Sequence, residues 1–171
     1  ADVITKDAVT QNGLFKVHML DEKVYFELPA SALGKDLLWK ATTSAGTAED
    51  AFAGQLTGET IVRFVRRGNH VYMKEVDYNL RDAAQKDDGF KTNVELNSTE
   101  TIVGSFPVAA EAPDGSAVVD VSSLFLGDPA SIGSRRAGGS GVDANRSFIE
   151  KVKAFPTNIE VTSTETLTGG A

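Results

Sequence analysis

The stretch GLFKVHMLDEKVYFELP, residues 13–29, decides the fold, because apolar and polar residues alternate on both sides of an acidic pair. Alternation with a period of two is typical of strands, so the stretch predicts a β-hairpin with Asp21-Glu22 at its tip. A four-residue loop, Leu20 to Lys23, leaves the pairing unchanged. Either turn brings six apolar side chains to one face of the hairpin. They are Phe15, Val17, Met19, Val24, Phe26 and Leu28.

The opposite face of this hairpin carries His18, one of two histidines in the chain. The register sets His18 opposite Tyr25, and Lys16 opposite Glu27. A sheet with one buried side and one wet side shows this alternation. We therefore expect His18 to lie on a solvated face, where water or a partner domain meets it.

Period-two alternation continues along most of the chain and predicts further strands. They fall at residues 36–43, 59–67, 70–78, 94–99, 101–112, 116–121 and 158–168. Short strands separated by turn residues, without the long helices of βαβ units, favour a mainly β fold. We expect antiparallel sheets that form a sandwich or a partly open barrel, with a few short helices.

Helical patterns are few. Residues 29–36 predict a single helical turn, capped by Ser31 and ended by Gly34 in a positive-φ conformation. Ser122 is predicted to start a second turn. In the segment RSFIEKVKAFP, residues 146–156, three apolar residues have helix-like spacing. They are Phe148, Val152 and Phe155.

The second predicted hairpin, residues 59–78, has Gly68-Asn69 at its tip. A two-residue turn sets Arg63 opposite Lys74, which is repulsive. A shift by one residue sets Arg63 opposite Glu75 instead. We expect the shifted register.

Three segments lack a period and predict loops. Residues 44–58 are rich in Gly, Ala and Thr, and residues 79–92 carry mixed charge, which predicts a short helix or an exposed loop. Residues 127–145 are rich in glycine, which favours a flexible loop. We expect one β-rich domain over residues 1–171 with this flexible loop inside it.

Composition excludes several classes of function. The chain has 171 residues, 41% of them hydrophobic, and a formal net charge of −7. An acidic chain has no general affinity for nucleic acid or anionic lipid, since both bind clustered Lys and Arg. The chain has no cysteine, so thiol catalysis, disulfides and cysteine-bound zinc are excluded. No apolar run approaches the length of about 18 residues that spans a membrane.

A search for catalytic and metal-binding motifs assigns no catalytic, cofactor or metal residue. A His-Glu-x-x-His motif is absent, and neither histidine has a second one four residues away. Ser140 in GGSGV only superficially resembles a nucleophile elbow, because Val142 replaces the closing glycine. The acidic pairs Glu49-Asp50 and Asp87-Asp88 lack the alternating spacing of a calcium loop. We interpret them as solvated loop residues.

Several polar residues have both a functional and a structural interpretation. His18 and His70 could meet as a base or a metal pair, but two solvated histidines are the simpler interpretation. An arginine cluster with Lys74 could bind an anion, but cross-strand pairing is favoured on an acidic protein. The arginines of this cluster are Arg63, Arg66 and Arg67. The remaining motifs are two glycosylation triplets, at Asn97 and Asn145, and a dibasic pair, Arg135-Arg136.

Five strings of sequence occur in a fixed order: GLFKVHMLDEKVYFELPASALGKDLL, IVRFVRRGNHVYMKEVDY, SFPVAAEA, VVDVSSLFLGD and NRSFIEKVKAFPTNIEV. In this order the chain resembles, from about Val3 to Thr168, the uncharacterised N-terminal region of large bacterial exported zinc-dependent metalloproteases. In that family the catalytic part lies downstream and carries a His-Glu-x-x-His motif with a further histidine. The resemblance implies a non-catalytic accessory or pro-domain that packs beside the protease domain of the same parent chain. It also implies export to the periplasm or the exterior, with the signal segment upstream of this chain.

Two other functions stay open. The first is an independent secreted or surface binding module for protein or glycan, with Trp39 and tyrosines exposed on one sheet face. Trp39 is instead favoured as a core residue, because its strand is apolar on both faces. The second is an enzyme acting alone, which lacks a recognisable catalytic set. An inhibitory pro-domain would need an Asp, Glu or His to reach the zinc, and the sequence selects none.

Overall fold

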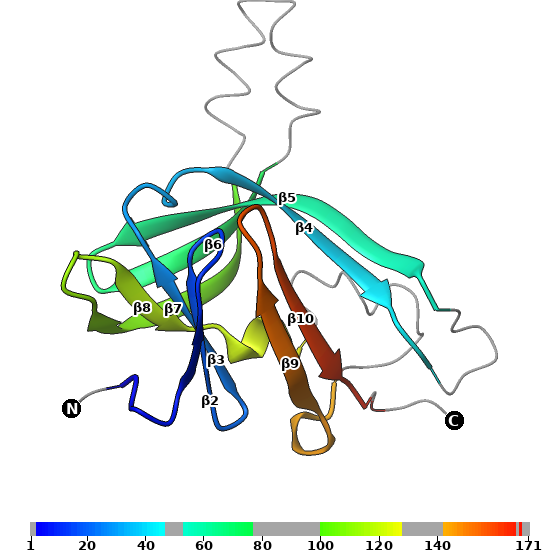
Figure 1. Ribbon diagram of the computed structural model, residues 1–171. Helices are drawn as coiled ribbons and strands as arrows, with labels where there is room; N and C mark the ends of the chain where they lie inside the picture. Colours follow the sequence, from blue (N-terminus) through cyan, green and yellow to red (C-terminus); the bar gives the residue numbers. More distant parts are fainter. Residues whose placement is uncertain (1–2, 47–52, 77–99, 128–141, 167, 169–171) are drawn as a thin grey trace, which may run out of the picture.

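The computed structural model describes residues 3–46, 53–76, 100–127, 142–166 and 168, and strands hold most of them (Figure 1). The strands are β1 (Val9–Gln11), β2 (Lys16–Leu20), β3 (Lys23–Leu28), β4 (Asp36–Thr43), β5 (Gln55–Arg67), β6 (His70–Val76), β7 (Thr101–Glu111), β8 (Ala117–Asp120), β9 (Phe148–Ala154) and β10 (Ile159–Thr164). Within these described ranges, the helical segments are two short 3-10 turns, η1 (Ser122–Leu124) and η3 (Ala144–Arg146). The predicted mainly β class is confirmed. Over the described ranges, no helix is long and apolar enough to cross a membrane.

The first eight strands form one antiparallel sheet in the order β1-β2-β3-β8-β7-β6-β5-β4. The sheet curls into a half-barrel, and β9 and β10 form a separate hairpin across its open side (Figure 1). The predicted partly open barrel is therefore confirmed. Its core lies between the concave face of the curled sheet and this hairpin.

The opening hairpin has the predicted register. Val17 pairs with Phe26 and His18 pairs with Tyr25. The tip is the two-residue turn, because Leu20 pairs directly with Lys23. Asp21 takes a positive φ of 53°, a conformation that aspartate tolerates better than most residues.

The core combines residues from both ends of the chain. Phe26 lies at its centre: its ring centroid is 4.9 Å from that of Phe15, 6.4 Å from that of Phe64 and 6.1 Å from that of Phe125. Burial of each such side chain stabilises the fold by about 1.5–3 kcal/mol. The buried core residues are Phe15, Val17, Val24, Phe26, Leu28, Val62, Phe64, Val71, Met73, Phe106, Ala117, Val119, Val121, Leu124, Ile149 and Val152.

The predicted register of the second hairpin is wrong. Arg63 pairs with Lys74, and Gly68 at the tip has a φ of 58°. The expected repulsion is relieved from outside the hairpin by Glu100. Its two carboxylate oxygens accept hydrogen bonds from Arg63 at 2.9 Å and from Lys74 at 3.3 Å. A carboxylate between two cations replaces the repulsion with two attractions.

The helix-like spacing near the C-terminal end is also misleading, because residues 148–154 form strand β9. Thr162 pairs with Lys151 and Ser163 pairs with Ile149, so Glu150 is an extra residue on β9. This bulge puts Ile149 and Val152, three residues apart, on the same buried face.

Two smaller predictions also need correction. Residues 30–34 form hydrogen-bonded turns rather than a helical turn, although Gly34 has the expected positive φ, 75°. Strand β5 begins at Gln55, inside the predicted loop 44–58. The strand expected at 94–99 and the segment 79–92 lie outside the described residues. Of the Gly-rich loop 127–145, the structure describes only its two ends.

A side-chain amide attaches the β9–β10 hairpin to the edge of the large sheet. Gln11 Nε2 donates to Val152 O at 2.8 Å, and Gln11 Oε1 accepts from Ala154 N at 3.0 Å. Leu14 N donates to Phe155 O at 2.7 Å. Gly13 permits this approach, because a Cβ there would lie 2.6 Å from Phe155 O. Gln11 thus takes the place of a neighbouring strand beside β9.

Replacing Gln11→Ala tests this attachment. It leaves the Val152 carbonyl and the Ala154 amide without their partner, so we expect the free energy of unfolding to fall by about 1–3 kcal/mol. Urea unfolding followed by circular dichroism measures the change. Gln55→Ala is the matched control, since Gln55 is also half-buried. Equal losses in the two variants would show that the attachment contributes nothing.

Candidate functional site

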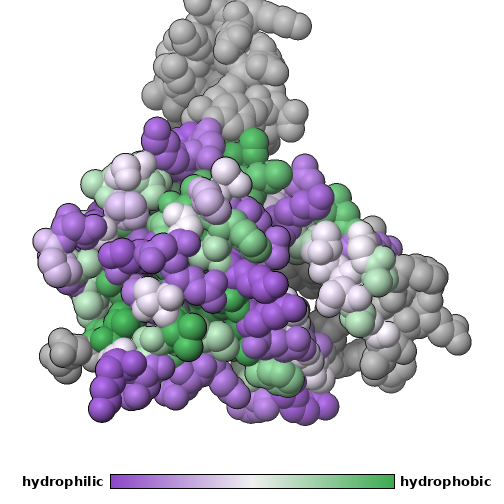
Figure 2. Space-filling model, in the orientation of Figure 1, coloured by the Kyte–Doolittle hydropathy of each residue, from purple (hydrophilic) through white to green (hydrophobic). Residues whose placement is uncertain are grey.

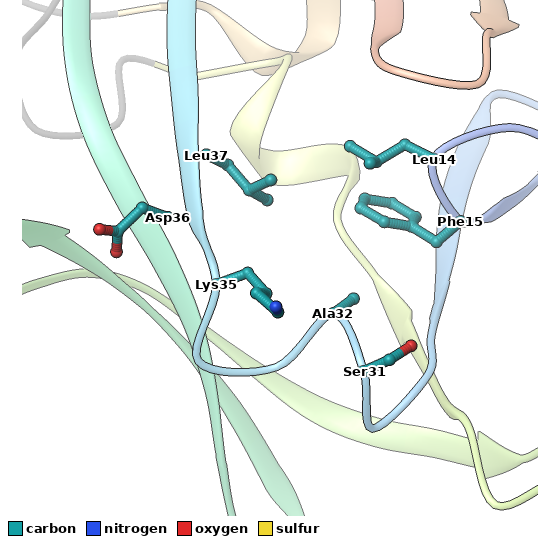
Figure 3. A pocket seen from close by; sticks show the side chains of 7 residues that line it. All are labelled: Leu14, Phe15, Ser31, Ala32, Lys35, Asp36 and Leu37. Atoms are coloured by element: carbon teal, nitrogen blue, oxygen red, sulfur yellow. The ribbon is translucent and has the colours of Figure 1, made fainter.

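An apolar pocket of about 340 Å³ opens where the start of β2 approaches the start of β4. Figure 3 shows Leu14 and Phe15 on one side of it, facing Leu37 across the opening, with Ala32 below. The lining residues are Leu14, Phe15, Ser31, Ala32, Lys35, Asp36 and Leu37. The pocket is thus built from the β1–β2 connection, the β3–β4 connection and β4.

The chemistry of this pocket suits an apolar side chain. Polar groups stand only on Ser31, Lys35 and Asp36, and the Asp36 carboxylate accepts from Arg63 Nε at 2.8 Å. Leu14, in the wall of the pocket, is 38% exposed, and Phe155, whose backbone carbonyl accepts from Leu14 N, is 39% exposed. Exposed apolar side chains around a concave apolar site are typical of surfaces that contact a partner or a ligand. The pocket can hold a hydrophobic group of a partner.

A second candidate is a row of hydrogen-bonded polar side chains across β1, β2 and β3. Thr10 Oγ1 lies 2.8 Å from His18 Nδ1, and His18 Nε2 lies 3.0 Å from Glu27 Oε2. Lys16 Nζ donates to Glu27 Oε1 at 2.6 Å. An ionised carboxylate only accepts hydrogen bonds, so Nε2 of His18 carries the proton toward Glu27.

The centre of this row is buried, between the exposed Thr10 and Lys16 at its ends, which corrects the expectation of a solvated His18. His18 is 5% exposed, Glu27 7% and Tyr25 8%. The hairpin lies inside the large sheet, with β1 beside β2 and β8 beside β3, so neighbouring side chains flank the second face. The sequence pattern of one hairpin contains no information about these flanking strands.

The row has the connectivity of a hydroxyl, an imidazole and a carboxylate, as in nucleophilic hydrolases. Thr10 is exposed on its short edge strand. None of Thr10, His18 and Glu27 lines the apolar pocket. The hydrogen bond and charge of Glu27 raise the pKa of the Lys16 ammonium above its ordinary value, so this carboxylate holds a cation at neutral pH. We interpret the row as a satisfied buried network that fixes the first hairpin.

A third hydrogen-bonded polar group, Asp120 with Ser122, lies at the C-terminal end of β8. Ser122 donates to Asp120 from its backbone N at 3.0 Å and from its hydroxyl at 2.6 Å. The same hydroxyl accepts from Val24 N at 2.9 Å. Burial raises the pKa of Asp120, but these hydrogen bonds and the Lys23 ammonium outweigh burial and bring the pKa below its ordinary value. The carboxylate is therefore ionised at neutral pH and anchors β3 to β8.

The arginine cluster does not converge on one site. Arg63 pairs with Asp36 and Glu100, whereas Arg66 pairs with Glu111. Arg67 is exposed opposite His70 at the hairpin end. Alternation along β5 puts Arg66 on the face opposite to Arg63 and Arg67.

The other singled-out residues lie apart from one another. His70 is half-exposed and stacks on Tyr72, with ring centroids 6.0 Å apart. Trp39 is half-buried, and Phe125 stacks on its ring at 5.6 Å, so one face of the indole is covered. In the described part of the chain, no group of three or more His, Asp or Glu residues could hold a metal ion.

Several predicted loop residues lie outside the described ranges. They are Ser140, Glu49, Asp50, Asp87, Asp88, Asn97, Arg135 and Arg136. Asn145 is described: it lies exposed in η3, and its backbone N donates to Asp143 Oδ1 at 3.0 Å.

Comparison with known proteins finds two family models along the chain. A model described as a domain of unknown function, DUF5117, matches residues 54–171, and a second one, DUF5118, matches residues 1–46. No curated protein and no solved structure matches the chain significantly. The boundary between the two matches falls between β4 and β5, which pair with each other in the sheet.

The buried row predicts a large effect of Glu27→Ala. It leaves the buried His18 without its carboxylate partner, whereas the exposed Lys16 turns to solvent, so we expect the free energy of unfolding to fall by about 1–3 kcal/mol. Glu111→Ala, at a carboxylate that is 58% exposed in its pair with Arg66, should cost under about 1 kcal/mol. Urea denaturation compares the two, and similar losses would contradict a stabilising role for the row.

The two matched segments predict one folding unit. Strand β3 pairs with β8 and strand β4 pairs with β5, so each segment completes the sheet of the other. We expect fragments 1–46 and 54–171 to be unfolded alone and to regain strand structure when mixed. Circular dichroism and amide NMR dispersion measure this. A folded 54–171 fragment would show instead that the segments are separate domains.

Proposed function

The chain belongs to the DUF5117 family, and on that premise we propose that it is a non-catalytic accessory domain of a bacterial zinc-dependent metalloprotease. In this proposal it packs beside the protease domain of the same parent chain, in the periplasm or outside the cell. The resemblance of the five sequence strings to the N-terminal region of such proteases motivates the proposal.

The apolar pocket beside Leu14 is the observation that carries the proposal. Its lining is mostly apolar, and Leu14, which forms part of the wall, is 38% exposed. Elsewhere, Figure 2 shows hydrophilic side chains over much of the visible face, with hydrophobic ones in small groups between them. A partner domain that inserts one apolar side chain here would bury the exposed part of Leu14. Central apolar contacts of this kind dominate the energy of protein interfaces.

Masking of the catalytic zinc is one way in which the domain could act on the protease. A domain that masks the zinc needs a side chain that reaches it, and this chain has no cysteine. Both ring nitrogens of His18 are engaged inside the buried row. His70 is half-exposed next to a hairpin tip, which makes it the better placed histidine. Of the two histidines we therefore assign any zinc masking to His70, and we assign docking to the Leu14 pocket.

Binding to the separately purified protease domain tests the docking. Leu14→Asp puts a charge at the pocket, so we expect the dissociation constant measured by calorimetry to rise at least about tenfold, or about 1.4 kcal/mol. Ile102→Asp is the control, since Ile102 is 55% exposed on β7 and does not line the pocket. His70→Ala should leave binding intact and relieve inhibition, if the zinc is masked. Absence of any association with the unmodified domain would contradict the proposal.

A further inference from the structure

Strand β4 is the open edge of the large sheet. It spans Asp36–Thr43 and, within the described part of the chain, pairs with β5 on one side and with no strand on the other. The opposite edge strand, β1, has three residues and is followed by the Gln11 attachment to β9. An edge strand presents a row of backbone donors and acceptors that can pair with another strand. Of the two edges of this sheet, β4 is the long one (Figure 1).

An apolar row on the convex face ends at this edge. Val76 pairs with Ile61, and Ile61 pairs with Leu38. Val76 is 5% exposed, whereas Leu38 at the end of the row is 63% exposed. This apolar row is thus buried at Val76 and exposed to solvent at Leu38. A further strand paired with β4 would continue the row beyond Leu38.

Opposite charges lie two residues to either side of Leu38. Asp36 lies opposite Arg63 in the sheet, and Lys40 lies opposite Glu59. All of these side chains share the convex face with Leu38, since residues two apart on a strand point to the same side. Strand β4 therefore carries the sequence acidic, apolar, basic along its open edge.

We propose that a second copy of this chain pairs with β4 in antiparallel fashion, about a two-fold axis at Leu38. The two Leu38 side chains then lie opposite each other, and each Asp36 lies opposite Lys40 of the second copy. The charges across the joined sheets alternate, from Arg63 to Asp36, then to Lys40 and Glu59 of the second copy. The apolar rows of the two copies become continuous, and Leu37 lies beside Trp39 of the second copy on the concave face.

Other two-fold registers place like charges, or an apolar and a charged side chain, opposite each other. An axis at Lys40 opposes two ammonium groups, and an axis at Asp36 opposes two carboxylates. An axis at Trp39 puts Leu38 opposite Lys40. A shift by one residue turns the concave face of one copy toward the convex face of the other. The axis at Leu38 matches both charge and polarity.

The edge strand β10 of the small hairpin lacks the arrangement of charged and exposed apolar residues that makes β4 complementary to itself. Its residues Ile159–Thr164 include one charged side chain, Glu160, and none of its apolar residues is among the strongly exposed ones. A pairing over Asp36–Lys40 is smaller than a standard interface of about 1,600 Å². The dimer is therefore reversible and depends on concentration.

Charge complementation at Leu38 tests the proposal. Sedimentation equilibrium of the full chain over a concentration series should show a monomer–dimer equilibrium. Leu38→Lys alone and Leu38→Asp alone oppose like charges at the axis, so we expect each to weaken self-association at least about tenfold. An equimolar mixture of the two variants should restore dimers, because lysine then faces aspartate.

Val9→Lys is the matched control, since Val9 is 61% exposed on the other edge strand, and it should dimerise like the unmodified chain. Urea unfolding of each variant verifies that the fold is intact. A chain that stays monomeric at every concentration overturns the proposal. A Leu38→Lys variant that dimerises as strongly as the unmodified chain also overturns it. An equimolar mixture of Leu38→Lys and Leu38→Asp that stays monomeric does so too. Binding of an unrelated extended peptide at β4 without self-association would assign the edge to a different partner.

Discussion

The short connection between β3 and β4 is the constraint on which the rest of the structure depends. In the sheet these two strands are separated by β8, β7, β6 and β5, which is about 24 Å in a flat sheet. The connecting residues 29–35 contain two turns, closed by the bonds from Ala32 N to Pro29 O and from Lys35 N to Ala32 O. Each turn brings its ends to within about 7 Å, so the connection cannot span a flat sheet. The sheet must curl until β4 returns toward β3.

The curl explains both the pocket and the position of the small hairpin. Curling encloses an apolar concave face, and the β9–β10 hairpin contributes Ile149 and Val152 to cover it. Gln11 and the close approach at Gly13 hold this cover against the β1 side. The pocket forms where the β3–β4 connection passes the start of β2, at the part of the rim that the cover leaves open.

Sequence patterns predict what is local in this fold and miss what comes from distant strands. The opening hairpin was predictable, because its alternation and its turn lie within residues 13–29. The buried state of His18 was not, since it depends on β1 and β8 beside the hairpin.

Two larger errors, in the register of the second hairpin and in the segment 146–156, concern contacts and backbone irregularities that local spacing does not show. Arg63 opposite Lys74 looked unfavourable until Glu100, far along the chain, supplied a carboxylate to both. The helix-like spacing of Phe148, Val152 and Phe155 did not mark a buried face, because Phe148 and Phe155 are exposed; the bulge at Glu150 instead puts Val152 and Ile149 together as buried residues. The pocket had no sequence pattern at all, since its lining comes from two separate segments, residues 14–15 and residues 31–37, that meet only in the folded chain.

The half-barrel also determines which surfaces are available for partners. A sheet that closed fully would have no edges, whereas this one, as far as the described strands go, ends at β1 and β4. The β1 edge is short and attached, so the free hydrogen-bonding capacity of the sheet is concentrated on β4. The pocket and the β4 edge meet at Asp36 and Leu37, because the connection that forces the curl leads directly into β4. One geometric constraint thus creates an apolar contact site and an open strand at the same corner of the molecule.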